Sequence, residues 1–237
     1  MRAFAGWLSM GVIFAFFVKA EEAAPSPQVE LEPVASLDIA NTAEGAYPGG
    51  ATPLSGSWYT EKSAVKLKAK AEPLVMGSIE FGPEIREKGA TICALARGPG
   101  GGRLKSRFGA GLYGKNGFCL RIDQGKQVME LVRRGMVIKA VEFKADPETL
   151  YEIELNVVED AENWMVTGRV WEYEADRPKE PAFTYRMYSD ELLFPLAGRP
   201  FLVATPFSGE PVQFAVARAY MGNPFDPAPE EEVEVKD

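Results

Sequence analysis

Residues 107–144, RFGAGLYGKNGFCLRIDQGKQVMELVRRGMVIKAVEFK, decide the fold class of this chain. Apolar residues recur at alternate positions along the stretch, which is the period of a β-strand and not of a helix. Turn signals interrupt the alternation three times, at 114–117 (GKNG), 125–126 (GK) and 134–135 (RG). The stretch therefore predicts a meander of four antiparallel strands.

The alternation also predicts how the four strands pair, because each hairpin must keep its apolar residues on one face. We expect the first hairpin to set Leu112 opposite Leu120, across a three-residue loop in which Gly117 takes the left-handed conformation. The second hairpin is expected to set Leu120 opposite Leu131, and the third to set Leu131 opposite Ile138. All three registers predict the same buried face.

The opposite face of the meander is then expected to carry a polar row of Gly111, Arg121, Glu130 and Lys139. Opposite charges side by side on a sheet can form ion pairs. Arg107 and Tyr113 are expected on this face too, beside glycines whose missing side chains leave a shallow trough. Such a trough suits a sugar, although a solvated ladder of charges explains the row as well. The candidate ligand-binding residues are Arg107, Tyr113, Arg121, Glu130 and Lys139.

The same alternation continues on both sides of the meander, between Gly56 and Met221, and predicts an antiparallel β-sandwich. No segment has a convincing helical stripe. Four large aromatic residues are expected in its core: Trp164, Trp171, Phe201 and Phe214. The expected strands are Ala64–Ala71, Met76–Phe81, Ala90–Arg97, Arg107–Tyr113, Phe118–Asp123, Val128–Arg133, Met136–Lys144, Leu150–Val158, Asn163–Tyr173, Ala182–Met187, Pro200–Thr205 and Val212–Met221.

The ends of the chain differ in composition from this body. Residues 1–20 combine Arg2, an apolar run and a final VKA, the layout of a secretory signal peptide, with an uncleaved membrane anchor as the alternative. We expect residues 21–53 to be a flexible linker, 54–222 the β-sandwich domain and 223–237 an acidic disordered tail. The protein is thus expected to be exported to the periplasm or exterior, touching a membrane only through an uncleaved first segment.

Charge and composition exclude several kinds of chemistry. Asp and Glu outnumber Lys and Arg by 34 to 26, so the net charge of −8 disfavours nucleic acid as a partner. The chain has no histidine, which excludes every Ser-His or Cys-His nucleophile pair and removes the commonest transition-metal ligand. We expect no metal and no cofactor. Cys93 and Cys119 are a possible disulfide if their strands are neighbours.

The strand order, the segment GSIEFGPEI at 77–85, the meander and the closing VQFAVARAY at 212–220 together resemble the concanavalin A-like lectin/glucanase superfamily. The likeness spans residues 54–221 and is greatest to uncharacterised envelope proteins of planctomycete-type bacteria. The resemblance implies a jelly-roll sandwich with a curved sheet that can hold a carbohydrate. It does not by itself imply an activity.

The acids of the chain do not reproduce the alternating pattern of the superfamily's glucanases. Glu152 and Glu154 alternate, but they are expected to be the solvated outer face of an ordinary strand. The sequence therefore favours a non-catalytic protein that binds a carbohydrate or glycoconjugate. The alternatives are a structural or protein-interaction component of the cell envelope and, with less support, a glycan hydrolase without a recognisable motif.

Overall fold

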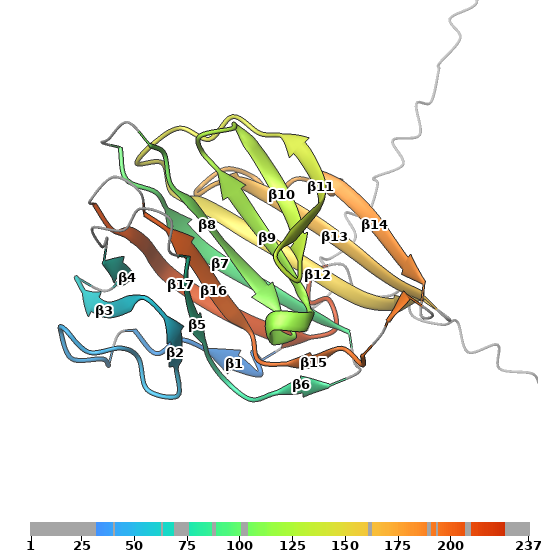
Figure 1. Ribbon diagram of the computed structural model, residues 1–237, viewed down its shortest axis with the longest axis horizontal. Helices are drawn as coiled ribbons and strands as arrows, with labels where there is room; N and C mark the ends of the chain where they lie inside the picture. The colour runs from blue at the N-terminus through green and yellow to red at the C-terminus, as the bar shows by residue number, and fades with distance from the viewer. Residues whose placement is uncertain are drawn as a thin grey trace, which may run out of the picture.

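Two antiparallel sheets lie face to face in the computed structural model, with a short two-stranded ribbon at one end (Figure 1). The structure describes residues 32–39, 41–62, 64–68, 76–86, 89–100, 104–160, 163–188, 191–192, 194–206 and 210–225. The expected signal peptide and the end of the tail lie outside these ranges. The predicted antiparallel β-sandwich is confirmed, and the described residues contain one short 3-10 helix, η1.

Eight strands form the first sheet, in the order β14-β13-β12-β7-β17-β4-β3 with β1 beside β17, and the second sheet has the order β11-β10-β9-β8-β16-β5-β2. The ribbon pairs β15 with β6. The bounds are β1 Ala35–Ser36, β2 Thr52–Ser55, β3 Ser57–Glu61, β4 Ala64–Lys68, β5 Gly77–Glu80, β6 Ile85–Arg86, β7 Ala90–Arg97, β8 Arg107–Leu112, η1 Gly114–Asn116, β9 Phe118–Asp123, β10 Val128–Arg133, β11 Met136–Glu142, β12 Tyr151–Asp160, β13 Asn163–Glu172, β14 Phe183–Tyr188, β15 Ala197–Gly198, β16 Phe201–Thr205 and β17 Val212–Met221.

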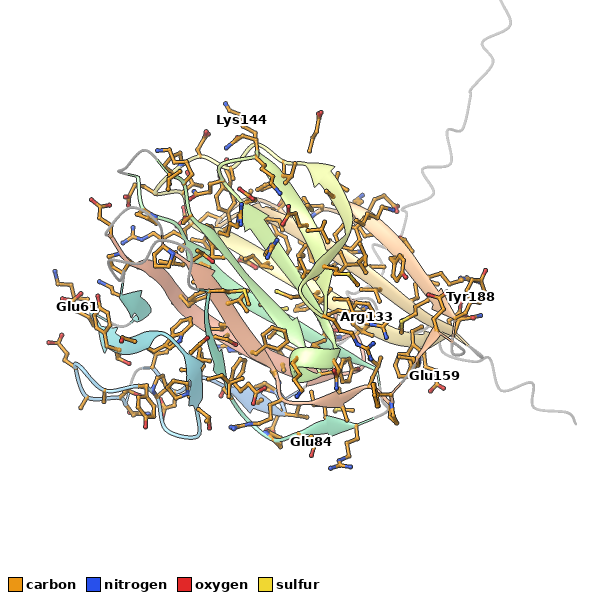
Figure 2. The ribbon with its side chains drawn as sticks, in the orientation of Figure 1. Glu61, Glu84, Arg133, Lys144, Glu159 and Tyr188 are labelled. Carbon is orange, nitrogen blue, oxygen red and sulfur yellow. The ribbon has the colours of Figure 1, made fainter. Side chains whose placement is uncertain are left out.

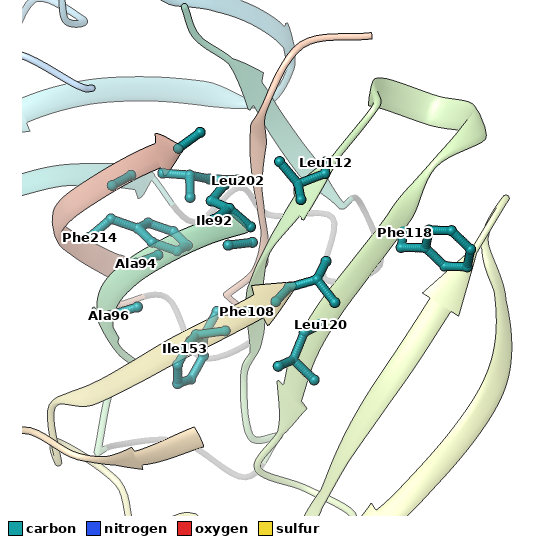
Figure 3. Close-up of a cluster of buried hydrophobic side chains, with 14 of the residues drawn as sticks. Ile92, Ala94, Ala96, Phe108, Leu112, Phe118, Leu120, Ile153, Leu202 and Phe214 are labelled. Atoms are coloured by element: carbon teal, nitrogen blue, oxygen red, sulfur yellow. The ribbon is translucent and has the colours of Figure 1, made fainter. Parts of the chain in front are cut away.

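The core fills the space between the two sheets, where alternate side chains of both turn inward (Figure 3). The seven-stranded sheet contributes Phe108 and Leu120, which are fully buried, and the eight-stranded sheet contributes Ile92, Ile153 and Phe214, which are fully buried as well. Inward-facing residues of two stacked sheets interlock to close packing. The apolar set that the alternation predicted is therefore the layer that holds the sheets together.

The four-strand meander is present, but only its central register is as predicted. Leu131 lies opposite Leu120, as expected. Leu112 pairs with Phe118 and not with Leu120, because the loop between β8 and β9 has five residues where three were expected. A shift by two residues keeps every side chain on its face, so the predicted core survives the error. The left-handed residues of this loop are Tyr113 and Gly114, not Gly117.

The third hairpin contains a β-bulge that the sequence did not reveal. Its turn lies at 134–135 as predicted, with both residues in the left-handed region. The register then shifts between Leu131 and Val132, so that Leu131 lies opposite Lys139 and not opposite Ile138. A bulge inserts one extra residue and changes which side chains face a given side.

Part of the expected linker belongs to the sandwich. Within residues 32–39 and 41–53, β1 pairs with the last strand β17, and Leu37 donates a backbone hydrogen bond to Ala217 at 3.0 Å. Leu37 and Ile39 are buried in the core. The apolar side chains of this segment are few, but Leu37 and Ile39 belong to the core, and this corrects the expectation of a flexible linker for these residues.

Leu120→Ala is expected to destabilise the protein by about 3 kcal/mol, because it leaves a cavity in the centre of the core. Val137→Ala on the edge strand β11, where the side chain is 43% exposed, is the control and is expected to cost under about 1 kcal/mol. Urea unfolding followed by circular dichroism measures both. Equal costs for the two variants would contradict the packing described for Leu120.

Candidate functional site

A groove of about 640 Å³ lies on the outer face of the seven-stranded sheet, away from the core. Four side chains from neighbouring strands form its apolar floor: Cys119 of β9, Val132 of β10, and Phe201 and Val203 of β16. The β8–β9 and β10–β11 turns bound one end, because both hairpins turn at the same end of the sheet. Concave sites with an apolar base and a few polar groups are typical of ligand pockets.

The polar rim of the groove comes from strands and turns on both sides of the floor. Ser78 and Glu80 project from β5, Lys115 and Asn116 from η1, Arg121 from β9 and Arg134 from the β10–β11 turn. At the far rim, Leu54 and Met76 are 57% and 46% exposed. Exposed apolar residues beside a hollow are typical of a contact surface for a ligand.

Two glycines of β8 shape this outer face. A Cβ atom at Gly111 would collide with the ring of Phe201, and one at Gly109 would collide with the backbone of Arg121. The space beside these two glycines, where a trough was predicted, is thus filled by the Phe201 ring and by the β9 backbone, and neither glycine lines the groove. Phe201, expected in the core, instead forms the floor of the groove, where it is opposite Gly111 in the β8–β16 pair.

The polar row on this face is Gly109, Arg121, Glu130 and Ala140, shifted at both ends from the prediction. Its centre is as expected: the Arg121 Nε donates to Glu130 Oε2 at 2.6 Å, and Lys126 Nζ donates to Oε1 at 2.9 Å. The Glu130 carboxylate is buried, and burial alone would raise its pKa. The hydrogen bonds and charges of Lys126 and Arg121 outweigh that effect and hold the Glu130 pKa below its usual value.

Arg107 lies on the same face but serves a second buried carboxylate. Its Nε donates to Asp123 Oδ2 at 2.7 Å, while Asp123 Oδ1 accepts the backbone N–H groups of Gly125 and Lys126 at 3.0 Å each. Asp123 therefore closes the β9–β10 turn. Arg107 is beside the row that the sequence predicted, and it does not line the groove.

Tyr113 is not on the polar face. It adopts a left-handed conformation with a φ of 63°, which breaks the alternation of β8 and turns its ring into the core. There it contacts the ring of Trp164, 6.5 Å away between centroids, and burial raises the pKa of its hydroxyl. The prediction that placed Tyr113 on the polar face is wrong for this reason.

Lys139 is also outside the predicted row, because the bulge in the third hairpin moves it to the other side of β11. Its Nζ donates to the carbonyl of Thr184 on β14 at 3.1 Å, and so it links the edges of the two sheets. The next residue, Ala140, occupies the position beside Glu130 that was predicted for Lys139. The sequence missed Lys115, Asn116 and Arg134 because they lie in turns, where alternation carries no information. Glu80 alternates outward on β5, but alternation does not say which strands β5 lies beside.

Cys93 and Cys119 are free, and the possible disulfide between them is not formed. Cys93 is on β7 of one sheet, close to Glu154, and Cys119 is on β9 of the other sheet, in the groove floor. Both side chains face away from the core, so the whole sandwich separates them. Burial raises the pKa of both thiols, that of Cys119 to about 12.

Glu154 lies on the outer face of the eight-stranded sheet as expected, but it is not solvated. Arg169 donates to its Oε1 at 2.8 Å, and Arg177 donates to both carboxylate oxygens at 2.6 and 2.8 Å. Arg169 also bonds the carbonyls of Pro178 and Lys179, which holds that segment over the sheet. Burial, followed by the charge of Glu154, raises the pKa of the neighbouring Glu152. This cluster anchors a loop.

A smaller hollow of about 360 Å³ is lined by Tyr59 and by four charged residues, two of which, Glu61 and Lys66, pair with each other at 2.6 Å. Among the described residues, no group of three or more Cys, Asp or Glu side chains is arranged to hold a metal ion. In the same ranges, no helix has the length and hydropathy needed to cross a bilayer.

Comparison with known proteins identifies the fold. No family model and no curated protein matches the sequence. Among solved structures, the metal-free carbohydrate recognition domain of Emp46p is similar with a TM-score of 0.60 and 14% identity, covering 82% of this chain and 100% of that one. Peanut lectin with a nonapeptide gives 0.55 and 9% (79% and 97% covered), and lectin UEA-II complexed with galactose gives 0.54 and 8% (79% and 98%). This chain has the concanavalin A-like lectin fold.

Glu130→Gln is expected to lower the stability at pH 7 by about 2 kcal/mol, because it leaves Arg121 without its anionic partner. The lowered pKa of Glu130 adds stability above the unfolded value of 4.5, and that stability is lost as the pH falls through the folded value. The difference between wild type and variant, measured by urea unfolding, should be constant from pH 7 to about 5 and shrink at lower pH. A difference that grows on acidification would contradict this.

Thiol titration of the protein unfolded without reductant is expected to find two free thiols per chain, since the two cysteines lie on opposite outer faces. In the folded protein both should react slowly with Ellman's reagent, because burial keeps them protonated at neutral pH. Finding no thiol before reduction and two after it would show that the bond forms.

Proposed function

We propose that this chain binds a carbohydrate or glycoconjugate, without catalysing a reaction, in the groove on the outer face of its seven-stranded sheet. The observation that carries the proposal is an apolar floor, centred on Phe201, within a rim of polar and charged side chains. A sugar ring presents apolar C–H groups on its faces and hydroxyl groups around its edge, so it matches such a surface.

The rim offers both hydrogen-bond donors and acceptors to sugar hydroxyls. The Ser78 hydroxyl and the Asn116 amide can do either, while the Glu80 carboxylate only accepts. All three come from β5 or η1, whose backbones pair with or pack beside the floor strands. Their positions are set by the sheet and by the turn that follows β8, which favours a preformed site.

The number of carboxylates in the groove favours binding over hydrolysis. Glu80 is the single Asp or Glu among the described residues that line the groove. Glycoside hydrolases generally need two carboxyl groups on either side of the scissile bond. Glu130, an acid on the same sheet face, is committed to Arg121 and Lys126 and is buried.

The similar structures support the same proposal. The Emp46p domain is a carbohydrate recognition domain, and UEA-II was complexed with galactose. Export, an envelope partner and closeness to planctomycete-type proteins stay predictions from the sequence. If the protein is exported, the groove is the proposed place where an exterior or envelope glycan would bind.

Ser78→Trp is expected to abolish glycan binding, because the indole fills the groove from β5 without entering the core. Ser57→Trp, at an exposed position of the edge strand β3, is the matched control and is expected to bind as the wild type does. A glycan array followed by calorimetry on the hits measures binding, and thermal unfolding confirms that both variants fold. The proposal is wrong if no glycan binds, or if Ser78→Trp binds as well as the control.

A further inference from the structure

The charges of the groove face are opposite in sign to the net charge of the protein. The chain carries −8 overall, yet the groove is lined by three cations, Lys115, Arg121 and Arg134, and by one acid, Glu80. Such local excess of one charge creates a potential that attracts ligands of the other sign. The strength of this potential depends on how far neighbouring carboxylates neutralise the three cations.

The carboxylates behind the groove do not neutralise its positive charge. In the described part of the chain, the ion pairs of Arg107, Arg121 and Lys126 are with two carboxylates, those of Asp123 and Glu130. The carboxylates are buried, whereas the three cations retain exposed surface, most of all Lys126 with 57%. The network therefore presents positive charge to solvent and hides its negative charge beneath.

Lys115 and Arg134 add charge at the turn end of the groove. In the described part of the chain, neither has an Asp or Glu within ion-pair distance, and both side chains are exposed. The guanidinium of Arg134 lies over the ring of Phe194, 5.4 Å from its centroid. A cation–π contact of this kind orients a guanidinium without neutralising its charge.

We infer that the groove selects an acidic saccharide, one whose carboxylate or sulfate group lies at the turn end, between the β8–β9 and β10–β11 turns. This inference rests on the proposed function, since it names the class of glycan for the same groove. The sugar ring packs on the floor formed by Phe201 and Val203, and the anion is bound by Lys115 and Arg134. Arginine and lysine are the usual partners of such anions.

Two pairs of polysaccharides test the inference, because the members of each pair share a sugar backbone and only one of them carries anionic groups. Polygalacturonate and its fully methyl-esterified form test carboxylate recognition, and dextran sulfate and dextran test sulfate recognition. Calorimetry with purified protein is expected to show at least about tenfold tighter binding of one acidic member than of its neutral counterpart. Raising the salt concentration should weaken that binding, since exposed charges are screened.

Lys115→Gln/Arg134→Gln is expected to lose at least about tenfold in affinity for the acidic polysaccharide that binds. The control, Lys144→Gln/Arg86→Gln, removes the same charge at side chains that are 84% and 72% exposed, and should lose less than about twofold. Lys144 points away from the sandwich (Figure 2). Thermal unfolding confirms that both double variants fold.

The outcomes separate this inference from the proposed function. Equal binding of acidic and neutral members, or equal losses in the two double variants, would overturn the selection of acidic saccharides. Glycan binding that Ser78→Trp abolishes would leave the groove as a neutral carbohydrate site in that case. Binding of no member of either pair, together with an array on which nothing binds, would overturn both.

Discussion

The groove face of the seven-stranded sheet depends on two positions of β8 that lack a side chain. At Gly111, the missing Cβ leaves the space into which the ring of Phe201 projects from β16, and at Gly109 it lets the backbone of β9 approach at Arg121. Any larger residue would collide there, because strand spacing leaves no room for two side chains at one place. The floor of the groove and its cationic side are therefore both consequences of glycine in one strand.

The inner face of the same strand has the opposite requirement. Phe108, Ala110 and Leu112 alternate with the glycines and are fully buried against the eight-stranded sheet. The large residues on one face of this strand pack in the core, while the glycines leave room on the other face for neighbouring groups. The attachment of β8 to the core and the close approach of its neighbours on the outer face thus come from alternate residues of one six-residue segment.

Much of this could be predicted from the sequence, for a definite physical reason. Strand alternation is a local property, so it predicted the sandwich, the buried side of Leu120 and Leu131, and the ion pair between Arg121 and Glu130. Side-chain faces survive a two-residue register error, which is why the misplaced first hairpin did not harm the core prediction. The structure places Arg121 in the groove. The binding role of all the candidate residues stays a prediction.

The features that failed depend on single backbone irregularities or on contacts between distant segments. The left-handed φ of Tyr113 and the bulge beside Val132 each moved one predicted site residue to another environment. Phe201 was misplaced because FLVAT at 201–205 is apolar on both faces, so alternation cannot say which side is the core. Residues 35–36 pair with the far end of the chain, a contact that composition does not reveal.

This acidic protein carries cations on one face of its seven-stranded sheet. Asp123 and Glu130 hold Arg107, Arg121 and Lys126 there through buried ion pairs, and such pairs fix side-chain positions more reliably than exposed ones. The fold is shared with lectins of low sequence identity, so it supplies the sheet but not the ligand class. The proposed class of ligand rests on the side chains of this sheet.

The contact between the Phe201 ring and Gly111 is the most direct test of the groove floor. In the NMR spectrum of the labelled protein, nuclear Overhauser effects are expected between the ring protons of Phe201 and the α-protons of Gly111, together with backbone effects between Gly111 and Cys119. Ring contacts of Phe201 with methyl groups of Ile92 or Ile153 in the core would instead place it between the sheets. In that case the groove would lose its floor, and the account would be contradicted.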